Sequence, residues 1–84
     1  MRFLYFYLMT GAPDGVRAAA PRHAAYWQEL ALPGYLGGPV ADRSGGLITF
    51  EAGSAAEAER LVDDDPFVQE DLLEHRWVKE WMIE

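Results

Sequence analysis

The chain has 84 residues, of which 50% are hydrophobic, 13% are aromatic and 25% are charged. This length predicts a single domain over residues 1–84 and excludes a second one, and the composition is that of a folded chain. The sequence contains no cysteine, which excludes thiol nucleophiles, thiolate zinc sites, iron–sulfur clusters and disulfides. Oligomerisation is then the main further source of stability for so short a chain.

The net charge of −7 lies entirely in the second half of the sequence. An acidic surface repels phosphate backbones and anionic head groups, so nucleic acids and membrane surfaces are poor partners. The apolar residues 1–9 are too few to span a bilayer and lack a small-residue cleavage site, so we expect a cytoplasmic protein. The acidic run at 63–65 lacks the spacing of a calcium loop and is expected to be a solvated helix end.

The first predicted element is a strand over residues 2–9, which is rich in aromatic residues and apolar on both faces. Such a strand must be covered on both sides. Turn residues follow, and Pro21 suits the first turn of a helix that ends before Pro33. Trp27 follows His23 at the spacing of one helix face, so we expect His23 in the first turn, on the side that packs inward.

The second half of the chain predicts a hairpin, a helix and a last strand. Ser54 and Glu57 have the spacing of a capping box for the helix, which stops before Pro66. Alternation and turn residues place the other elements, which are strands at 35–40 and 46–51 joined by a polar link at 41–45, a further helical turn or two within 67–73, and a last strand at 76–83.

The order strand, helix, strand, strand, helix, strand predicts an α+β fold of the ferredoxin-like βαββαβ type, with a four-stranded antiparallel sheet and both helices on one face. The other face of the sheet is then bare. Trp77 and Trp81 share one side of the last strand, so a single chain would expose a large apolar patch. We therefore expect a homodimer, or a higher assembly, in which two sheets meet face to face.

His23 is the candidate catalytic residue of the sequence. At the first turn of a helix, the positive end of the macrodipole would favour the neutral imidazole, which can accept a proton. A histidine on an apolar helix face can also be a satisfied core residue. The other histidine, His75, is expected to be partly exposed. Asp42, at the end of the second strand, could orient His23, whereas Asp65 before Pro66 is more readily explained as a helix cap.

Several reaction classes lack their motifs. Neither serine lies in a nucleophile elbow, and there is no phosphate-binding glycine loop, dinucleotide fingerprint or histidine-rich metal set. A reaction would therefore run by proton transfer, and we predict no cofactor and no metal. Tyr5, Tyr7 and Trp27 could line an apolar pocket between helix and sheet, although aromatic residues at these spacings also make ordinary core.

Four parts of the chain together resemble the YCII-related proteins, and the likeness spans nearly the whole sequence. They are the opening aromatic strand, His23 within residues 21–27, the Gly37-Gly38-Pro39 step followed by Asp42, and Asp65-Pro66-Phe67 before a strand with Val78-Lys79. The resemblance implies a single YCII-related domain with the ferredoxin-like fold of the dimeric α+β barrel superfamily. It also implies a His–Asp pair in a pocket, with His23 as the histidine, Asp42 as the preferred acid and Asp65 as a second candidate.

The resemblance further implies a small enzyme without cofactor, a lyase or isomerase. In this hypothesis His23 is a general base, Asp42 holds its tautomer, and the substrate is a small, cyclic or aromatic metabolite. Arg22, adjacent to His23, is a possible pocket residue. The alternative is a ligand-binding or assembly module of the same fold, in which the pair only satisfies a buried polar group.

Overall fold

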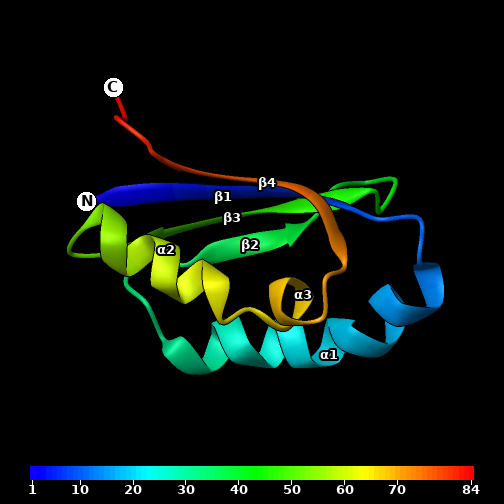
Figure 1. The fold of residues 1–84 in the computed structure, drawn as a ribbon. Helices are drawn as coiled ribbons and strands as arrows, with labels where there is room; N and C mark the ends of the chain where they lie inside the picture. Colours follow the sequence, from blue (N-terminus) through cyan, green and yellow to red (C-terminus); the bar gives the residue numbers. More distant parts are fainter.

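The computed structural model describes residues 1–84 and has the ferredoxin-like α+β fold (Figure 1). Neighbouring strands of its four-stranded sheet are antiparallel, in the order β2-β3-β1-β4. The elements in chain order are β1 (Arg2–Met9), α1 (Pro13–Leu30), β2 (Leu36–Pro39), β3 (Gly45–Glu51), α2 (Ala55–Asp63), α3 (Pro66–Gln69) and β4 (Leu73–Glu80).

All three helices lie on one side of the sheet, as Figure 1 shows. The alternation of β1 turns Phe3, Tyr5 and Tyr7 toward the helices, and all three are buried. The rest of the core comes from the inward faces of the other elements: Ala19, Trp27, Ile48, Phe50, Ala58, Val62, Phe67 and Leu72. None of the helices combines the length and the apolar composition that crossing a bilayer needs.

Helix α1 begins at Pro13, eight residues before the predicted start at Pro21. Pro13 occupies the first helical turn, and Pro21 lies inside the helix. The fixed φ of proline is compatible with a helix, and the alanines on both sides of Pro21 favour helix strongly. His23 therefore lies in the helix interior, so the prediction that it lies in the first turn, next to the positive end of the macrodipole, is wrong.

Helix α2 has the predicted cap, since the Ser54 side chain accepts a hydrogen bond from the Glu57 N–H at 3.1 Å. The Glu57 carboxylate in turn accepts from the N–H of Gly53. A sharp break follows at Asp65, which caps the short helix α3 by accepting from the Phe67 N–H. The break places the Asp65 side chain under α1.

Strand β4 spans Leu73–Glu80, three residues earlier than predicted at each end. Its pairing with β1 runs from Met9 opposite Leu73 to Phe3 opposite Glu80. Because β1 begins at Arg2, the chain beyond Trp81 has no strand to pair with, and the last bond is from Trp81 N–H to the Arg2 carbonyl. The alternation of apolar residues continues past the point where the sheet ends.

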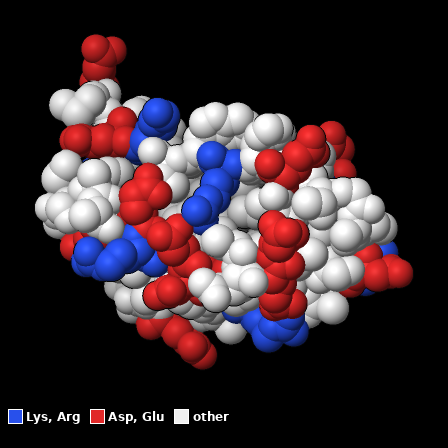
Figure 2. Space-filling view, in the orientation of Figure 1, with Lys and Arg blue, Asp and Glu red and all other residues white.

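Acidic side chains, with basic ones between them, are spread over the face of the molecule that Figure 2 shows. The helix-free face of the sheet is different in character, because it carries Phe6, Leu47 and Trp77 at opposing positions of three strands. Leu47 and Trp77 are each 42% exposed. This face is the one that the predicted homodimer would cover.

Candidate active site

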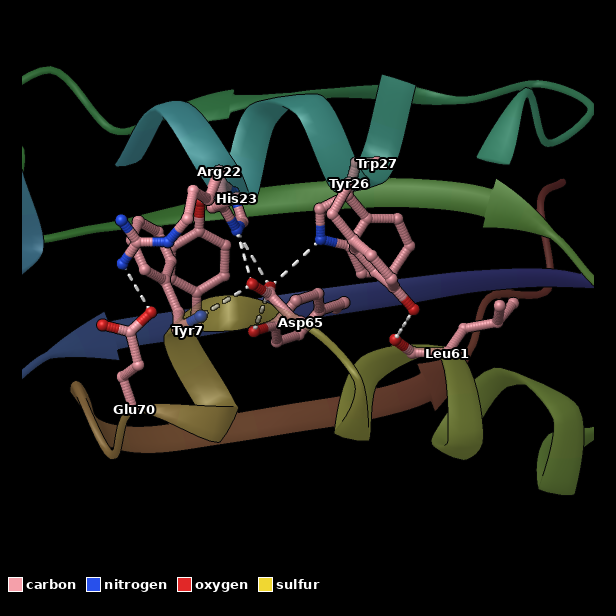
Figure 3. Close-up of polar contacts among 10 residues, drawn as sticks. Tyr7, Arg22, His23, Tyr26, Trp27, Leu61, Asp65 and Glu70 are labelled. Atoms are coloured by element: carbon pink, nitrogen blue, oxygen red, sulfur yellow. Dashed lines mark hydrogen bonds and ion pairs between the residues drawn. The ribbon is translucent and has the colours of Figure 1, made fainter. Parts of the chain in front are cut away.

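The carboxylate of Asp65 is fully buried and accepts hydrogen bonds from four groups (Figure 3). The donors are the Tyr5 hydroxyl at 3.1 Å, the Trp27 indole N–H at 3.0 Å, the Phe67 backbone N–H at 2.9 Å and His23 Nδ1 at 2.8 Å. The indole and the backbone N–H can only donate, one to each oxygen of Asp65. Both oxygens of this buried carboxylate therefore have hydrogen-bond donors.

His23 lies between Asp65 and Tyr7, with its ring fixed on three sides. Nδ1 lies 2.8 and 2.9 Å from the two oxygens of Asp65, so Nδ1–H donates to the carboxylate, and in the neutral imidazole Nε2 is then the acceptor. The Tyr7 hydroxyl lies 3.3 Å from Nε2 and donates to it in this tautomer. The imidazole also stacks on the Phe67 ring, with centroids 4.0 Å apart and an angle of 14° between the planes.

A cavity of about 330 Å³ opens beside His23 between α1 and the sheet. His23 and Tyr7 both border it, and the His23 side chain is 12% exposed. Its other lining residues are Met9, Val16, Ala20, Ala24, Gln28, Tyr35, Gly37, Gly38, Pro39, Arg43, Gly45, Ile48 and Phe67. The cavity thus has apolar walls and a few polar groups, as small-molecule sites do.

The tyrosines around Asp65 keep their protons at neutral pH. Burial raises the pKa of Tyr5 and of Tyr7, and in both cases the charge of Asp65 raises it further. Burial, with Asp64 and Asp65, raises the pKa of Tyr26 to about 12. Burial and Asp65 act in the same direction on the pKa of Tyr35, at the opposite wall of the cavity. Tyr5 and Tyr7 are therefore hydrogen-bond donors in the site rather than bases.

The prediction that Asp42 pairs with His23 is wrong, and Asp65 holds that place. Asp42 lies in the exposed link between β2 and β3, where its carboxylate accepts from the Ser44 N–H at 3.0 Å and the Ser44 hydroxyl at 2.6 Å. These bonds to Ser44 lower the pKa of Asp42. Strand β2 ends at Pro39, so Asp42 belongs to the turn, and a turn carboxylate bonds to backbone two residues on.

Of the other residues predicted to line the pocket, only Tyr7 does so. Tyr7 borders the cavity, whereas Tyr5 and Trp27 lie behind it as buried donors to Asp65. Arg22 points away from the cavity toward the surface, where it forms an ion pair with Glu70 at 2.6 Å (Figure 3).

Three polar residues of the cavity wall were not predicted from the sequence. Gln28 comes from α1, Tyr35 from the segment before β2, and Arg43 from the link between β2 and β3. Gln28 is five residues after His23 on the same helix, which is a weak signal in the sequence. No local pattern marks Tyr35 or Arg43, because only the folded sheet brings them to α1.

Comparisons with known proteins agree with this architecture. The family model of the YCII-related domain matches residues 3–82. A similar solved structure is the 5-chloro-2-hydroxyhydroquinone dehydrochlorinase of Burkholderia phenoliruptrix in complex with 2,5-dihydroxybenzoquinone. It shares 27% sequence identity and a TM-score of 0.87 with this chain, and the match covers 98% of this chain and 94% of the other. No curated protein sequence matches significantly.

Proposed function

The chain belongs to the YCII-related family, and from this premise we propose that it is a small-molecule enzyme that moves protons with the Asp65–His23 pair. Its substrate is a small hydroxylated ring compound, and its reaction is an elimination or an isomerisation. One observation carries the proposal: a buried carboxylate fixes Nδ1 of His23, the other ring nitrogen lies next to the Tyr7 hydroxyl, and both residues border a cavity large enough for one ring.

The arrangement suits a general base. Asp65 keeps the proton on Nδ1, so the lone pair of Nε2 is available to accept a proton from a substrate. When Nε2 takes that proton, the imidazolium lies directly against the carboxylate and is stabilised by it. Asp65 touches no substrate in this scheme and is a positioning residue.

For an isomerisation, Nε2 takes a proton from a ring hydroxyl, the oxygen electron pair forms a C=O bond, and the imidazolium returns the proton to a ring carbon. For an elimination, neutral His23 then takes the proton of a second ring hydroxyl, whose oxygen electron pair forms a second C=O bond. The ring double bond shifts toward the newly protonated carbon, and chloride leaves that carbon with the C–Cl bonding pair. Atoms and charge balance as loss of HCl, and neither sequence needs an oxidant or a reductant.

In the absence of substrate, the Tyr7 hydroxyl occupies the hydrogen-bonding position at Nε2. This hydroxyl donates to neutral Nε2 and can rotate to accept from Nε2–H once the imidazole is charged. A bound substrate takes the place of this bond at Nε2, which frees the Tyr7 O–H to donate to a substrate oxygen. The raised pKa of Tyr7 keeps this donor protonated throughout.

The size of the cavity and the structural relative support a ring compound as substrate. A volume of about 330 Å³ is at the small end of ligand sites. The solved relative, named a chlorohydroxyhydroquinone dehydrochlorinase, holds a dihydroxyquinone. Aromatic and aliphatic walls from Phe67 and Ile48 suit the faces of such a ring.

The test measures chloride release and quinone formation from 5-chloro-2-hydroxyhydroquinone and from other chlorinated hydroxyhydroquinones. In His23→Asn, the amide N–H can still donate to Asp65 but nothing replaces Nε2, so we expect turnover to fall by about 100-fold or more. Arg22→Gln is the matched control, because Arg22 is adjacent in sequence and points away from the cavity. It should keep wild-type turnover.

Two results would contradict the proposal. Undiminished turnover in His23→Asn would remove the base from the mechanism. Tight binding of these compounds, without conversion of any by the wild-type protein, would make the fold a ligand-binding module instead.

A further inference from the structure

Arg43 borders two adjoining cavities. It lines the cavity of His23, and it also lines a wider one of about 750 Å³ that begins near the end of β1. The two cavities share Met9, Val16 and Ala20 with Arg43, so they meet along this wall. Arg43 therefore lies at the junction of the two cavities.

The guanidinium of Arg43 has no partner within the chain. Arg2, Arg17, Arg22 and Arg76 each form an ion pair with a carboxylate, whereas Arg43 forms none, as is also true of Arg60 and Lys79 outside the cavity. No aspartate or glutamate lines the His23 cavity. Apart from His23, Arg43 is the one side chain in its wall that can be positively charged.

A hydrogen-bonded turn fixes the backbone conformation of Arg43. Its backbone has a φ of 65°, in the left-handed region that side chains disfavour, and its N–H bonds to the Val40 carbonyl at 2.9 Å. The two bonds from Ser44 to the Asp42 carboxylate close the same turn. Asp42, expected beside His23, instead supports the conformation of its neighbour Arg43.

The net negative charge of the protein makes a local cation important for binding an anion. At a net charge of −7, the protein repels anions over most of its surface. A local positive charge favours the entry of an anion into the site, and the planar guanidinium of an arginine binds oxyanions through paired N–H donors.

From this placement we infer that Arg43 binds an ionised oxygen of the substrate, so the substrate class is an anion such as a phenolate, an enolate or a carboxylate. The inference rests on the proposed function and specifies its substrate. Arg43 binds the anionic oxygen, and His23 acts on the ring that the cavity encloses. Proton removal from a ring hydroxyl also increases the negative charge that Arg43 meets.

The test compares two probes by calorimetry: 2,5-dihydroxybenzoquinone, whose enolic hydroxyls ionise at neutral pH, and its neutral dimethyl ether. We expect the wild-type protein to bind the anion about 10-fold more tightly than the ether. Arg43→Gln should weaken binding of the anion by about 10-fold and leave the ether unchanged, and Arg43→Lys should restore part of the affinity. Arg60→Gln removes the same charge from helix α2, in the wall of neither cavity, so it should have little effect.

Equal affinity of the wild-type protein for the two probes would overturn the inference, as would failure to bind the anion. An equal loss in Arg43→Gln and Arg60→Gln would also overturn it, because only overall charge would then matter. Turnover without any effect of Arg43→Gln would leave the proposed function standing and remove the anion site. Binding of the anion through Arg43 without turnover of any substrate would keep the anion site and contradict the proposed function.

Discussion

At the residue scale, Asp65 and His23 form one unit in which each side chain depends on the other. A buried carboxylate is costly unless every lone pair finds a donor, and four donors surround Asp65. His23 supplies the donor nearest the cavity. Its imidazole is fixed by Asp65, Tyr7 and the Phe67 ring, so it needs little reorganisation before it accepts a proton.

This dependence predicts different stabilities for two substitutions of His23. His23→Ala removes a donor from buried Asp65 and the stacking on Phe67, so it should lower the free energy of unfolding by about 3 kcal/mol. His23→Asn keeps a donor at the position of Nδ1 and should lose only about 1–2 kcal/mol. Urea unfolding followed by circular dichroism measures both. Equal losses would show that Asp65 does not depend on this hydrogen bond.

The sequence identified His23 but favoured the wrong acid. Asp42 and Asp65 both follow elements that could approach the first helix, and local patterns cannot tell which one reaches it. Asp65 looked like a simple cap of α3, and it does cap α3. A carboxylate has two oxygens, however, and the same group that accepts from Phe67 N–H also accepts from His23. The second role needs the long-range packing of α1 on α3.

At the scale of elements, the register of β1 against β3 positions the Tyr7 hydroxyl. Tyr7 lies directly opposite Gly46, and the phenol ring occupies the space where a Cβ of residue 46 would be. Only glycine leaves room for the ring there, so the strand pairing itself directs Tyr7 toward His23. Gly46 thus supports the site without touching the cavity chemistry.

Gly46→Ala should therefore displace the Tyr7 hydroxyl from His23. The methyl group meets the far end of the Tyr7 side chain, which can shift, and the backbone carbonyl of Gly38 in β2. We therefore expect a folded but less stable protein whose turnover falls by about 10-fold, toward that of Tyr7→Phe. Gly11→Ala, where a Cβ has open space, should keep both stability and turnover. Steady-state kinetics of the three variants measures this. Wild-type rates in Gly46→Ala would mean that the position of Tyr7 is unimportant.

The elements themselves were largely predictable, and the errors have physical causes. The hairpin strands and the Ser54 cap follow from short-range alternation and capping chemistry, and the structure has them within about one residue. The start of α1 was predicted at the wrong proline, because either Pro13 or Pro21 can begin a helix. The end of β4 depends on where β1 begins, which no pattern within β4 contains.

At the scale of the whole molecule, one face of the sheet has no cover within the chain. Phe6 and Trp77 lie together on that face with ring centroids 5.5 Å apart, and Leu36 is 73% exposed at its edge. Apolar patches of this kind mark surfaces that meet another protein. A second copy of the chain offers the same patch, and a two-fold axis would bury both.

We predict that the protein is a homodimer in solution, or a larger assembly of dimers. Sedimentation at micromolar concentration should give at least twice the 9.4 kDa mass of the chain. Trp77→Glu places a charge on the edge strand of this face, beside Phe6, and should give monomers that melt at a lower temperature, because the dimer stabilises each chain by mass action. A wild-type monomer at that concentration would contradict the prediction.

The central claim is that His23 holds its proton on Nδ1 against Asp65 and presents Nε2 as the base. Two-bond ¹H–¹⁵N correlation spectra of the uniformly ¹⁵N-labelled protein measure this tautomer directly. The chain has two histidines, so the spectrum of His23→Asn assigns the signals, and exposed His75 serves as an internal reference. At neutral pH we expect the ¹⁵N shift of a protonated Nδ1 and an unprotonated Nε2 for His23. A proton on Nε2 with an unprotonated Nδ1 would contradict the account.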